Sequence, residues 1–240
     1  FHCTGSQQIP GRSQLLHCWR STGHGAEKTP QALQNSCNIA FAHIALKLGG
    51  EQFYSYISRF GILEKTGIDL PAEPTPVAGV NYHAYDSMGL VELSSSSFGQ
   101  SFQVTPIQMI TAISAIANGG KLMTPYVVQK QLDENGNVIS ETRPIVRRQV
   151  ISEQTAATVA DMMEAVVTSG TGKNAYVSGY RVAGKTGTAE TVVNGVRSEK
   201  DYVVSFMGYA PADDPQIAIY VVVDRPNVGR QDDAKHATRL

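Results

Sequence analysis

The sequence predicts an α+β fold in which helices pack on one antiparallel β-sheet. Helical patterns occupy most of the chain up to about residue 169, and the clearest strand patterns follow it. The predicted strands Tyr202–Tyr209 and 217–223 are joined by the turn sequence 211–215, which makes them an antiparallel hairpin. Helices and strands do not alternate along the chain, so a parallel β–α–β arrangement is not expected.

Composition and charge are those of a globular protein. The 240 residues are 42% hydrophobic and 17% charged with a net charge of -1, which gives no reason to expect a nucleic-acid partner. No apolar run approaches the roughly 20 residues that span a bilayer. The chain begins at Phe1 without a leader pattern, and we interpret this start as a cut inside a longer protein.

Capping residues and apolar spacing predict the helices. Thr29-Pro30 places a threonine cap before a proline at the first helical position, and Thr105-Pro106 repeats this pattern. Ser152 caps a further helix that Gly170 ends. The expected helices are one that starts at Thr29-Pro30, 39–48, 51–60, 105–118 and 152–169.

The remaining segments are expected to be loops and strands. Prolines interrupt 66–104, and we predict that its serine run, Ser94–Ser97, lies in a solvated loop. A hairpin turn at 133–136 predicts a small β-structure within 124–150. Residues 217–223 are almost all apolar, so we expect that strand to be buried on both faces.

Lys185-Thr186-Gly187-Thr188 is the most informative motif. A strand leads into it, so it is expected at a strand edge. Lysine supplies a compact cation for a proton-transfer network, the two threonines supply hydroxyls for a substrate carboxylate, and glycine allows a substrate backbone to approach. The amide of Thr188 is a candidate oxyanion donor. These are requirements of serine-based acyl transfer.

A second motif, Ser36-Cys37-Asn38, has the S-x-N pattern that accompanies K-T-G in penicillin-binding proteins and serine β-lactamases. Ser36 is suited to pass a proton between lysine and a leaving group, and the Asn38 amide is suited to hold a substrate carbonyl and a catalytic lysine together. Alone, such a triplet arises readily by chance. The third motif, S-x-x-K, is absent from the 240 residues, so the nucleophilic serine is missing.

The whole chain resembles the transpeptidase domain of class B penicillin-binding proteins. It is most similar to the cell-division and sporulation D,D-transpeptidases of Gram-positive, clostridia-like bacteria. Besides the two triplets, the resemblance rests on Gly23-His24-Gly25, Ser97–Gln100, Val104–Gln108, Asn118–Gly120 with Pro125, Thr188–Glu190 and Phe206–Pro211. It implies the penicillin-binding-protein and β-lactamase type of α+β fold.

The resemblance also implies a function. Such proteins cross-link peptidoglycan stem peptides: a serine attacks the D-Ala-D-Ala bond, D-alanine leaves, and an amine of a neighbouring stem takes the acyl group. β-Lactams acylate the same serine. The resemblance assigns catalysis to Ser36, Asn38 and Lys185 and substrate binding to Thr186–Thr188. It requires no cofactor, and it implies a membrane-anchored parent at the extracytoplasmic face, associated with the cell-wall synthesis machinery.

The missing S-x-x-K and the chain ends predict a partial domain over residues 1–240. In this family S-x-x-K lies several dozen residues before S-x-N, and only 35 residues precede Ser36. At the other end, 237–240 would open the family's final helix. We therefore expect a fragment that lacks the nucleophile helix, the first strands and the closing helix. It should not turn over substrate alone, and its uncovered sheet should make it prone to aggregate.

Cysteine and histidine cluster near the start of the chain. Cys3, Cys18 and His24 are candidate zinc ligands, although their spacing fits no standard finger or ribbon. Some clostridial relatives are reported to bind zinc near S-x-N, so a structural zinc with a fourth ligand upstream is one hypothesis. The alternatives are a Cys3–Cys18 disulfide and a purely structural role for His24 between two glycines. Cys37 is interpreted as a small packed thiol.

Two further functions compete with the transpeptidase hypothesis. One is a non-enzymatic β-lactam sensor or pseudoenzyme of the same fold. The other, a serine β-lactamase, is disfavoured because the long segment 66–104 suits a larger, multi-part transpeptidase.

Overall fold

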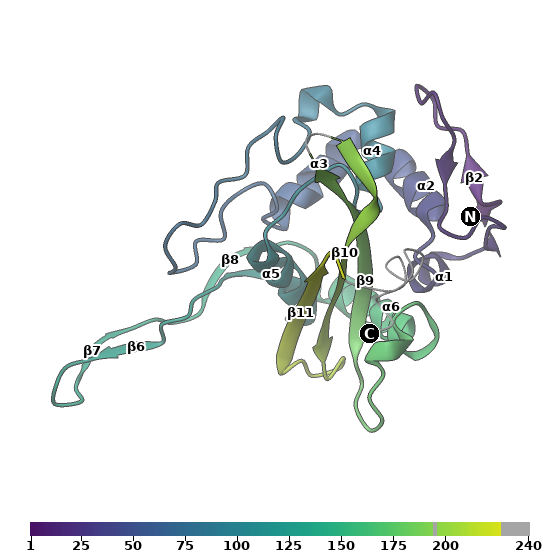
Figure 1. Cartoon of the computed structure of the whole chain (residues 1–240). Helices are drawn as coiled ribbons and strands as arrows, with labels where there is room; N and C mark the ends of the chain where they lie inside the picture. The colour runs from purple at the N-terminus through teal and green to yellow at the C-terminus, as the bar shows by residue number, and fades with distance from the viewer. Residues whose placement is uncertain (194–195, 227–240) are drawn as a thin grey trace.

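The computed structural model describes residues 1–193 and 196–226. Its centre is a three-stranded antiparallel sheet in the order β11–β10–β9 (Figure 1). The strands are β9 (Ala183–Val193), β10 (Val196–Ala210) and β11 (Ile217–Asp224). In the register of β9 and β10, Lys185 lies opposite Met207 and Gly187 opposite Ser205. The predicted α+β class and the antiparallel β10–β11 hairpin are therefore confirmed.

The described residues form six α-helices, of which α5 and α6 pack on this sheet. They are α1 (Thr29–Gln34), α2 (Asn38–Leu48), α3 (Gly50–Arg59), α4 (Leu90–Ser96), α5 (Pro106–Ala117) and α6 (Glu153–Ser169). Helices α5 and α6 bury Ile113 and Met163 against Ala183 and Tyr209 of the sheet, and these side chains form one apolar core. A second core, which includes Ile9 and Ile39, joins the N-terminal segment to α2.

The caps agree well with the sequence. Thr105 accepts a hydrogen bond from the amide of Gln108, and Ser152 accepts one from the amide of Thr155, as expected of N-cap residues. The start of α1 differs by one position: its N-cap is Lys28, and Thr29-Pro30 forms the first helical turn. Proline is tolerated there because its missing N–H would have no partner within the helix.

The prediction of a solvated loop at Ser94–Ser97 is wrong. Three of these serines belong to α4 and are buried, with Ser94 completely inaccessible. The Ser94 hydroxyl donates to the carbonyl of Val91 at 2.8 Å, and Ser97 donates to the carbonyl of Ser94 at 2.7 Å. Because the hydroxyls bond to the helix backbone, the small side chains can be buried against α2 without losing hydrogen bonds.

Short strands form the periphery. Two-stranded pairs join β1 (His2–Cys3) to β4 (Gly25–Ala26), β2 (Ser6–Gln7) to β3 (Leu16–His17), β5 (Lys121–Thr124) to β8 (Ile145–Gln149), and β6 (Lys130–Leu132) to β7 (Val138–Glu141). The β6–β7 pair is the hairpin expected within 124–150, and Figure 1 shows it projecting from the body as an arm.

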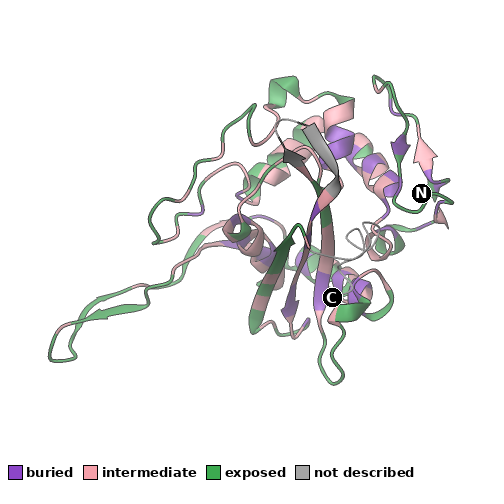
Figure 2. Ribbon diagram, viewed as in Figure 1, coloured by how far each residue is buried: buried purple, intermediate pink, exposed green. Residues whose placement is uncertain are grey.

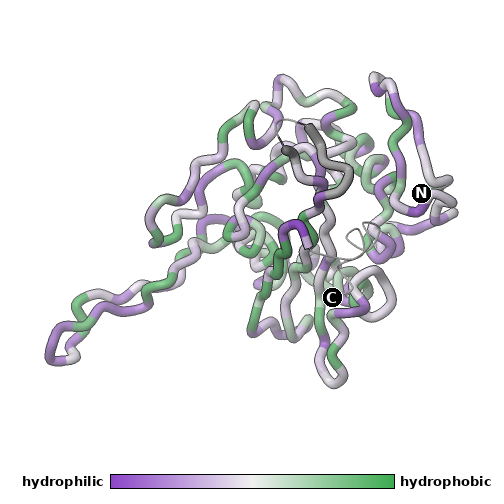
Figure 3. The backbone as a smooth tube through the Cα atoms, viewed as in Figure 1, coloured by the Kyte–Doolittle hydropathy of each residue, from purple (hydrophilic) through white to green (hydrophobic). Residues whose placement is uncertain are grey.

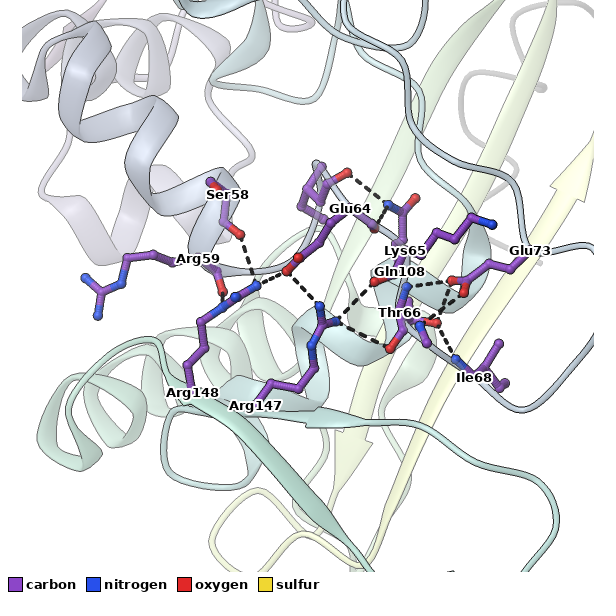
Figure 4. A network of polar contacts seen from close by, with 12 residues as sticks. Ser58, Arg59, Glu64, Lys65, Thr66, Ile68, Glu73, Gln108, Arg147 and Arg148 are labelled. Carbon is purple, nitrogen blue, oxygen red and sulfur yellow. Dashed lines mark hydrogen bonds and ion pairs between the residues drawn. The ribbon is translucent and has the colours of Figure 1, made fainter.

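A polar network anchors the base of this arm (Figure 4). The Glu64 carboxylate pairs with Arg147 at 2.9 Å and also with Arg148. The buried Gln108 side chain donates to the carbonyls of Ile62 and Glu64, both at 2.9 Å. The network therefore fixes the segment that follows α3 against α5 and the strand that leads back from the arm.

The prediction that the strand at 217–223, which is β11, is buried on both faces is wrong. Ile217, Ile219 and Val221 are half or more exposed, and β10 is the strand's only partner in the described part of the chain. Figures 2 and 3 show that the strand is both exposed and apolar. Its apolar sequence therefore reflects a surface that α5 covers only in part. The predicted helix start at 237–240 lies outside the described residues. Within those residues, no helix is both long and apolar enough to cross a membrane.

Candidate active site

Ser36 and Lys185 meet although 149 positions separate them in the sequence. The ammonium of Lys185 donates to Ser36 Oγ at 2.8 Å and to the Thr186 carbonyl at 2.9 Å. Ser36 lies at the junction between α1 and α2, and Lys185 lies near the start of β9. The structure thus joins the S-x-N and K-T-G motifs into one site.

The backbone of Ser36 is unusual. Its φ of 52° lies in the left-handed region, where residues other than glycine are strained. Neighbouring contacts hold this conformation: the Trp19 indole donates to the Asn35 carbonyl at 2.8 Å, and the Gln34 amide donates to Ser169 Oγ at 2.6 Å. The serine hydroxyl is therefore presented to β9 by contacts with both the N-terminal segment and α6.

Strand β9 places the K-T-G motif through close packing. A Cβ added to Gly187 would lie 2.6 Å from Ser205 Oγ on β10, so only glycine fits there without a shift. The Thr186 hydroxyl lies 3.1 Å from the hydroxyl of Thr171, which follows α6. The Thr188 side chain is exposed, while Thr186 is only partly so. The threonine hydroxyl groups and the backbone at Gly187, which has no side chain, therefore lie together beside Lys185.

Burial lowers the pKa of Lys185 to about 8, from an ordinary value of 10.5. Desolvation disfavours the charged ammonium, and no carboxylate offsets it in the described structure. Near neutral pH a fraction of Lys185 is then an uncharged amine, which can accept a proton from Ser36 Oγ. A hydrogen-bonded serine–lysine pair with this pKa is suited to proton transfer.

Asn38 is less closely tied to the pair. Its amide nitrogen donates to the His17 carbonyl at 3.2 Å, and it forms no hydrogen bond with Lys185 or Ser36 among the described residues. The role predicted for Asn38, to hold a substrate carbonyl and a catalytic lysine together, stays a prediction.

Gln100 is a residue that the sequence reasoning did not assign to the site. Its side-chain amide reaches the Thr188 carbonyl at 3.4 Å, from a loop that follows α4. The sequence gave one signal, because Ser97–Gln100 is one of the motifs on which the family resemblance rests. It did not indicate a partner for the Gln100 side chain.

The Cys/His cluster lies beside this site. Cys3, Cys18, His24 and Cys37 bring their ligand atoms within 4.8 Å of one another. All three thiols are free and buried, so the alternative Cys3–Cys18 disulfide is not formed. The predicted set Cys3, Cys18 and His24 is thus brought together, and Cys37, interpreted only as a packed thiol, supplies the fourth side chain.

The pKa values of the neighbouring thiols Cys18 and Cys37 are shifted in opposite directions. A hydrogen bond from Cys37 lowers the pKa of Cys18 to about 5, and burial opposes that shift. The same hydrogen bond, together with burial, raises the pKa of Cys37. Cys18 is therefore the more acidic thiol of the pair, and His24 Nδ1 lies 3.6 Å from Cys18 Sγ.

A K-T-G strand held against an S-x-N serine is the arrangement of penicillin-recognising serine enzymes. Within that class, the chain belongs to the penicillin-binding protein transpeptidase domain family, which matches residues 2–240. It is 43% identical, over 94% of its length, to stage V sporulation protein D of Bacillus subtilis.

Solved structures agree with this assignment. Penicillin-binding protein 3 of Mycobacterium tuberculosis superimposes with a TM-score of 0.85 and 30% identity over 94% of this chain. The D,D-transpeptidase domain of a peptidoglycan glycosyltransferase from Eggerthella lenta gives a TM-score of 0.81 at 26% identity over 99% of this chain. The chain spans 34% of the sporulation protein and 51% and 57% of these two solved chains.

Proposed function

We propose that the S-x-N and K-T-G motifs form two sides of the active site of a penicillin-binding D,D-transpeptidase, an enzyme that cross-links peptidoglycan stem peptides. The main support for this proposal is the hydrogen bond between Ser36 and Lys185, together with the lowered pKa of Lys185. The acyl-accepting serine is not among the 240 residues, which contain no S-x-x-K. By this proposal the 240-residue chain is inactive alone and acts within a larger, membrane-anchored protein at the extracytoplasmic face, with the cell-wall synthesis machinery.

In the proposed reaction the serine oxygen attacks the carbonyl of a D-Ala-D-Ala bond. The C–N bond breaks, the serine proton passes to the leaving amine, and D-alanine departs. The Thr186 and Thr188 hydroxyls hold the terminal carboxylate, and Ser36 passes the proton between Lys185 and the leaving nitrogen. An amine from a second stem peptide then attacks the acyl ester and restores the serine. β-Lactams acylate the same serine, and aztreonam and ampicillin complexes are known for the M. tuberculosis relative.

Covalent labelling tests this proposal. Fluorescent penicillin should not label the 240-residue chain, because the chain lacks the S-x-x-K serine and Ser36, which bonds to Lys185, serves as a proton relay. The full-length protein should be labelled, and Lys185→Met should reduce labelling by a factor of about 100 or more, since general acid–base catalysis contributes roughly 100- to 10,000-fold. Lys47→Met, on the exposed side of α2, is the matched control. Labelling of the short chain at Ser36 would contradict the proposed roles.

A second candidate is a non-enzymatic β-lactam sensor or pseudoenzyme of the same fold, and the missing S-x-x-K favours the pseudoenzyme. A sensor would be acylated by penicillin but would release no D-alanine from a D-Ala-D-Ala peptide, and a pseudoenzyme would do neither. Release of D-alanine by the full-length protein therefore distinguishes a transpeptidase from both a sensor and a pseudoenzyme.

We also propose that Cys3, Cys18, Cys37 and His24 bind a structural zinc ion. Three thiols and one imidazole form a donor set that zinc takes in tetrahedral sites. All four ligand atoms lie within 4.8 Å of one another, and the three thiols are buried and free. When bound, zinc would link the N-terminal segment to the S-x-N motif and stabilise the fold without entering the reaction.

Metal analysis of a reduced, chelator-free sample tests the zinc site. One zinc per chain is expected, and Cys37→Ser or Cys3→Ser should lower the occupancy strongly. His2→Ala, an exposed histidine next to Cys3, should leave it unchanged. A wild-type chain without stoichiometric zinc would reject the site.

A further inference from the structure

A polar cavity of about 330 Å³ lies between the N-terminal segment, α4 and the loop that follows α4. Its volume suits a group the size of an amino acid. Most of its lining is charged or hydroxyl-bearing, and it comes from segments far apart in the sequence: Arg12, Gln14, His83, Glu92, Ser95 and Ser101. No residue of the K-T-G or S-x-N motif lines it.

Arg12 gives this cavity a positive charge that no direct ion pair neutralises in the described part of the chain. Its guanidinium donates one hydrogen bond, to Ser95 Oγ at 3.2 Å, and forms no ion pair in the described structure. Glu92, in the same lining, accepts from the Gly89 amide at 3.0 Å and does not pair with Arg12. Arginine carries five N–H donors in a fork that matches a carboxylate, so most of its donors remain available to a ligand.

The cavity is connected to β9 through α4 and its loop. Arg12 bonds to the Ser95 hydroxyl, and the Ser95 carbonyl accepts from the Gln100 amide at 3.2 Å. The Gln100 side chain then reaches the Thr188 carbonyl at 3.4 Å. Ser101, the residue after Gln100, lines the cavity itself. These hydrogen bonds therefore link the cavity to the strand that carries the K-T-G motif.

We propose that this cavity is a subsite for a free carboxylate of the stem peptide, held by Arg12. The proposal rests on the proposed transpeptidase function and adds a specificity residue outside its motifs. A peptide carboxylate is favoured over a phosphate because the cavity also holds the Glu92 carboxylate, which repels a dianion but can accept an N–H from a peptide. Arg12 binds and orients the peptide and takes no part in proton transfer.

Peptide binding to the 240-residue chain tests the subsite. The probes are a synthetic stem tripeptide with free carboxylates, the same tripeptide with every carboxylate amidated, and inorganic phosphate, each titrated while backbone amide shifts are recorded. The free tripeptide should shift the Ser95 and Ser101 amides, and Arg12→Gln should weaken its binding roughly tenfold or more, as expected for a charge-assisted pair. Arg143→Gln, an exposed arginine of the β6–β7 arm, is the matched control.

Three outcomes would overturn the proposal: equal binding of the free and amidated tripeptides, tighter binding of phosphate, or binding insensitive to Arg12. If Arg12→Gln fails to fold, the comparison of the two tripeptides on the wild-type chain still decides. Penicillin labelling of the full-length protein reports the proposed function separately. A labelled protein with Arg12-independent peptide binding would reject the subsite alone, whereas an unlabelled one with Arg12-dependent binding would reject the transpeptidase.

Discussion

Replacing Lys185 with methionine should change how the stability of the chain depends on pH. Methionine has a similar volume but no charge, so Lys185→Met removes the buried ammonium and its hydrogen bonds to Ser36 and Thr186. The lost hydrogen bonds shift stability by an amount that does not vary with pH. The lost ionisation produces a pH-dependent difference between the two proteins, and that difference is the quantity to measure.

The magnitude follows from the pKa of Lys185. A fall from 10.5 to about 8 corresponds to about 3 kcal/mol at one pKa unit per 1.4 kcal/mol. This is an upper limit, because the side chain keeps partial contact with solvent. Burial disfavours the charged form, so the wild-type chain carries the whole penalty below pH 8 and loses it as the pH rises to 10.5. Between pH 7 and pH 10 the wild-type chain should gain about 2–3 kcal/mol at most relative to Lys185→Met.

Urea unfolding of both proteins at several pH values between 7 and 10 measures this difference, and subtraction removes the other titrating groups. Lys47→Met gives the effect of deleting an exposed ammonium. The titration of Lys185, followed through the ¹³Cε resonance of labelled lysine, supplies an independent value. A constant difference between the two proteins across this range, together with titration of Lys185 near 10.5, would refute the desolvation argument.

Four other substitutions have defined expectations. Ser152→Ala removes the cap of α6 and should lower the free energy of unfolding by about 1 kcal/mol in urea titrations. Gly187→Ala should destabilise the chain by about 1–3 kcal/mol, and adding Ser205→Ala should recover most of this; no recovery would contradict the close contact. Glu64→Gln should destabilise by about 1 kcal/mol or less, with a smaller effect at high salt. Ile219→Lys should reduce self-association in sedimentation velocity, since Ile219 is 50% exposed on a sheet edge.

Local signals made the helices and the hairpins predictable. A cap such as Thr105 or Ser152 acts through atoms within three residues, so the sequence alone contains the whole interaction. The predictions that failed concern segments whose burial is determined by tertiary contacts. The serine run at 94–97 is polar, yet its hydroxyls bond to their own helix and allow burial. The apolar strand at 217–223 carries no sign of how much of its surface the rest of the chain covers.

The candidate site was predictable in its chemistry but not in its contacts. The motifs identified Ser36 and Lys185, because few other roles require those residue types in that order along the chain. The clustering of Cys3, Cys18 and His24 near the start of the chain suggested a metal site, although their spacing is not a standard one. Cys37 was assigned to packing, because a cysteine inside another motif has no signal of its own. Arg12 belongs to no motif and Gln100 to one that indicates no partner, so only the fold brings Arg12 to Ser95 and Gln100 to β9.

Residues 34–37 connect these findings, because Ser36 is held from two directions. On one side Gln34 bonds to the end of α6, and on the other Cys37 belongs to the Cys/His cluster. Lys185 is fixed separately, by the pairing of β9 with β10. Loss of the cluster should therefore move Ser36 while Lys185 stays in place, lengthening the contact of 2.8 Å between them. In Cys37→Ser, amide shifts should change around Ser36 and remain unchanged along β9. Equal changes in the amide shifts around Ser36 and along β9 would show that the whole domain responds and that Ser36 and Lys185 are not held in place independently.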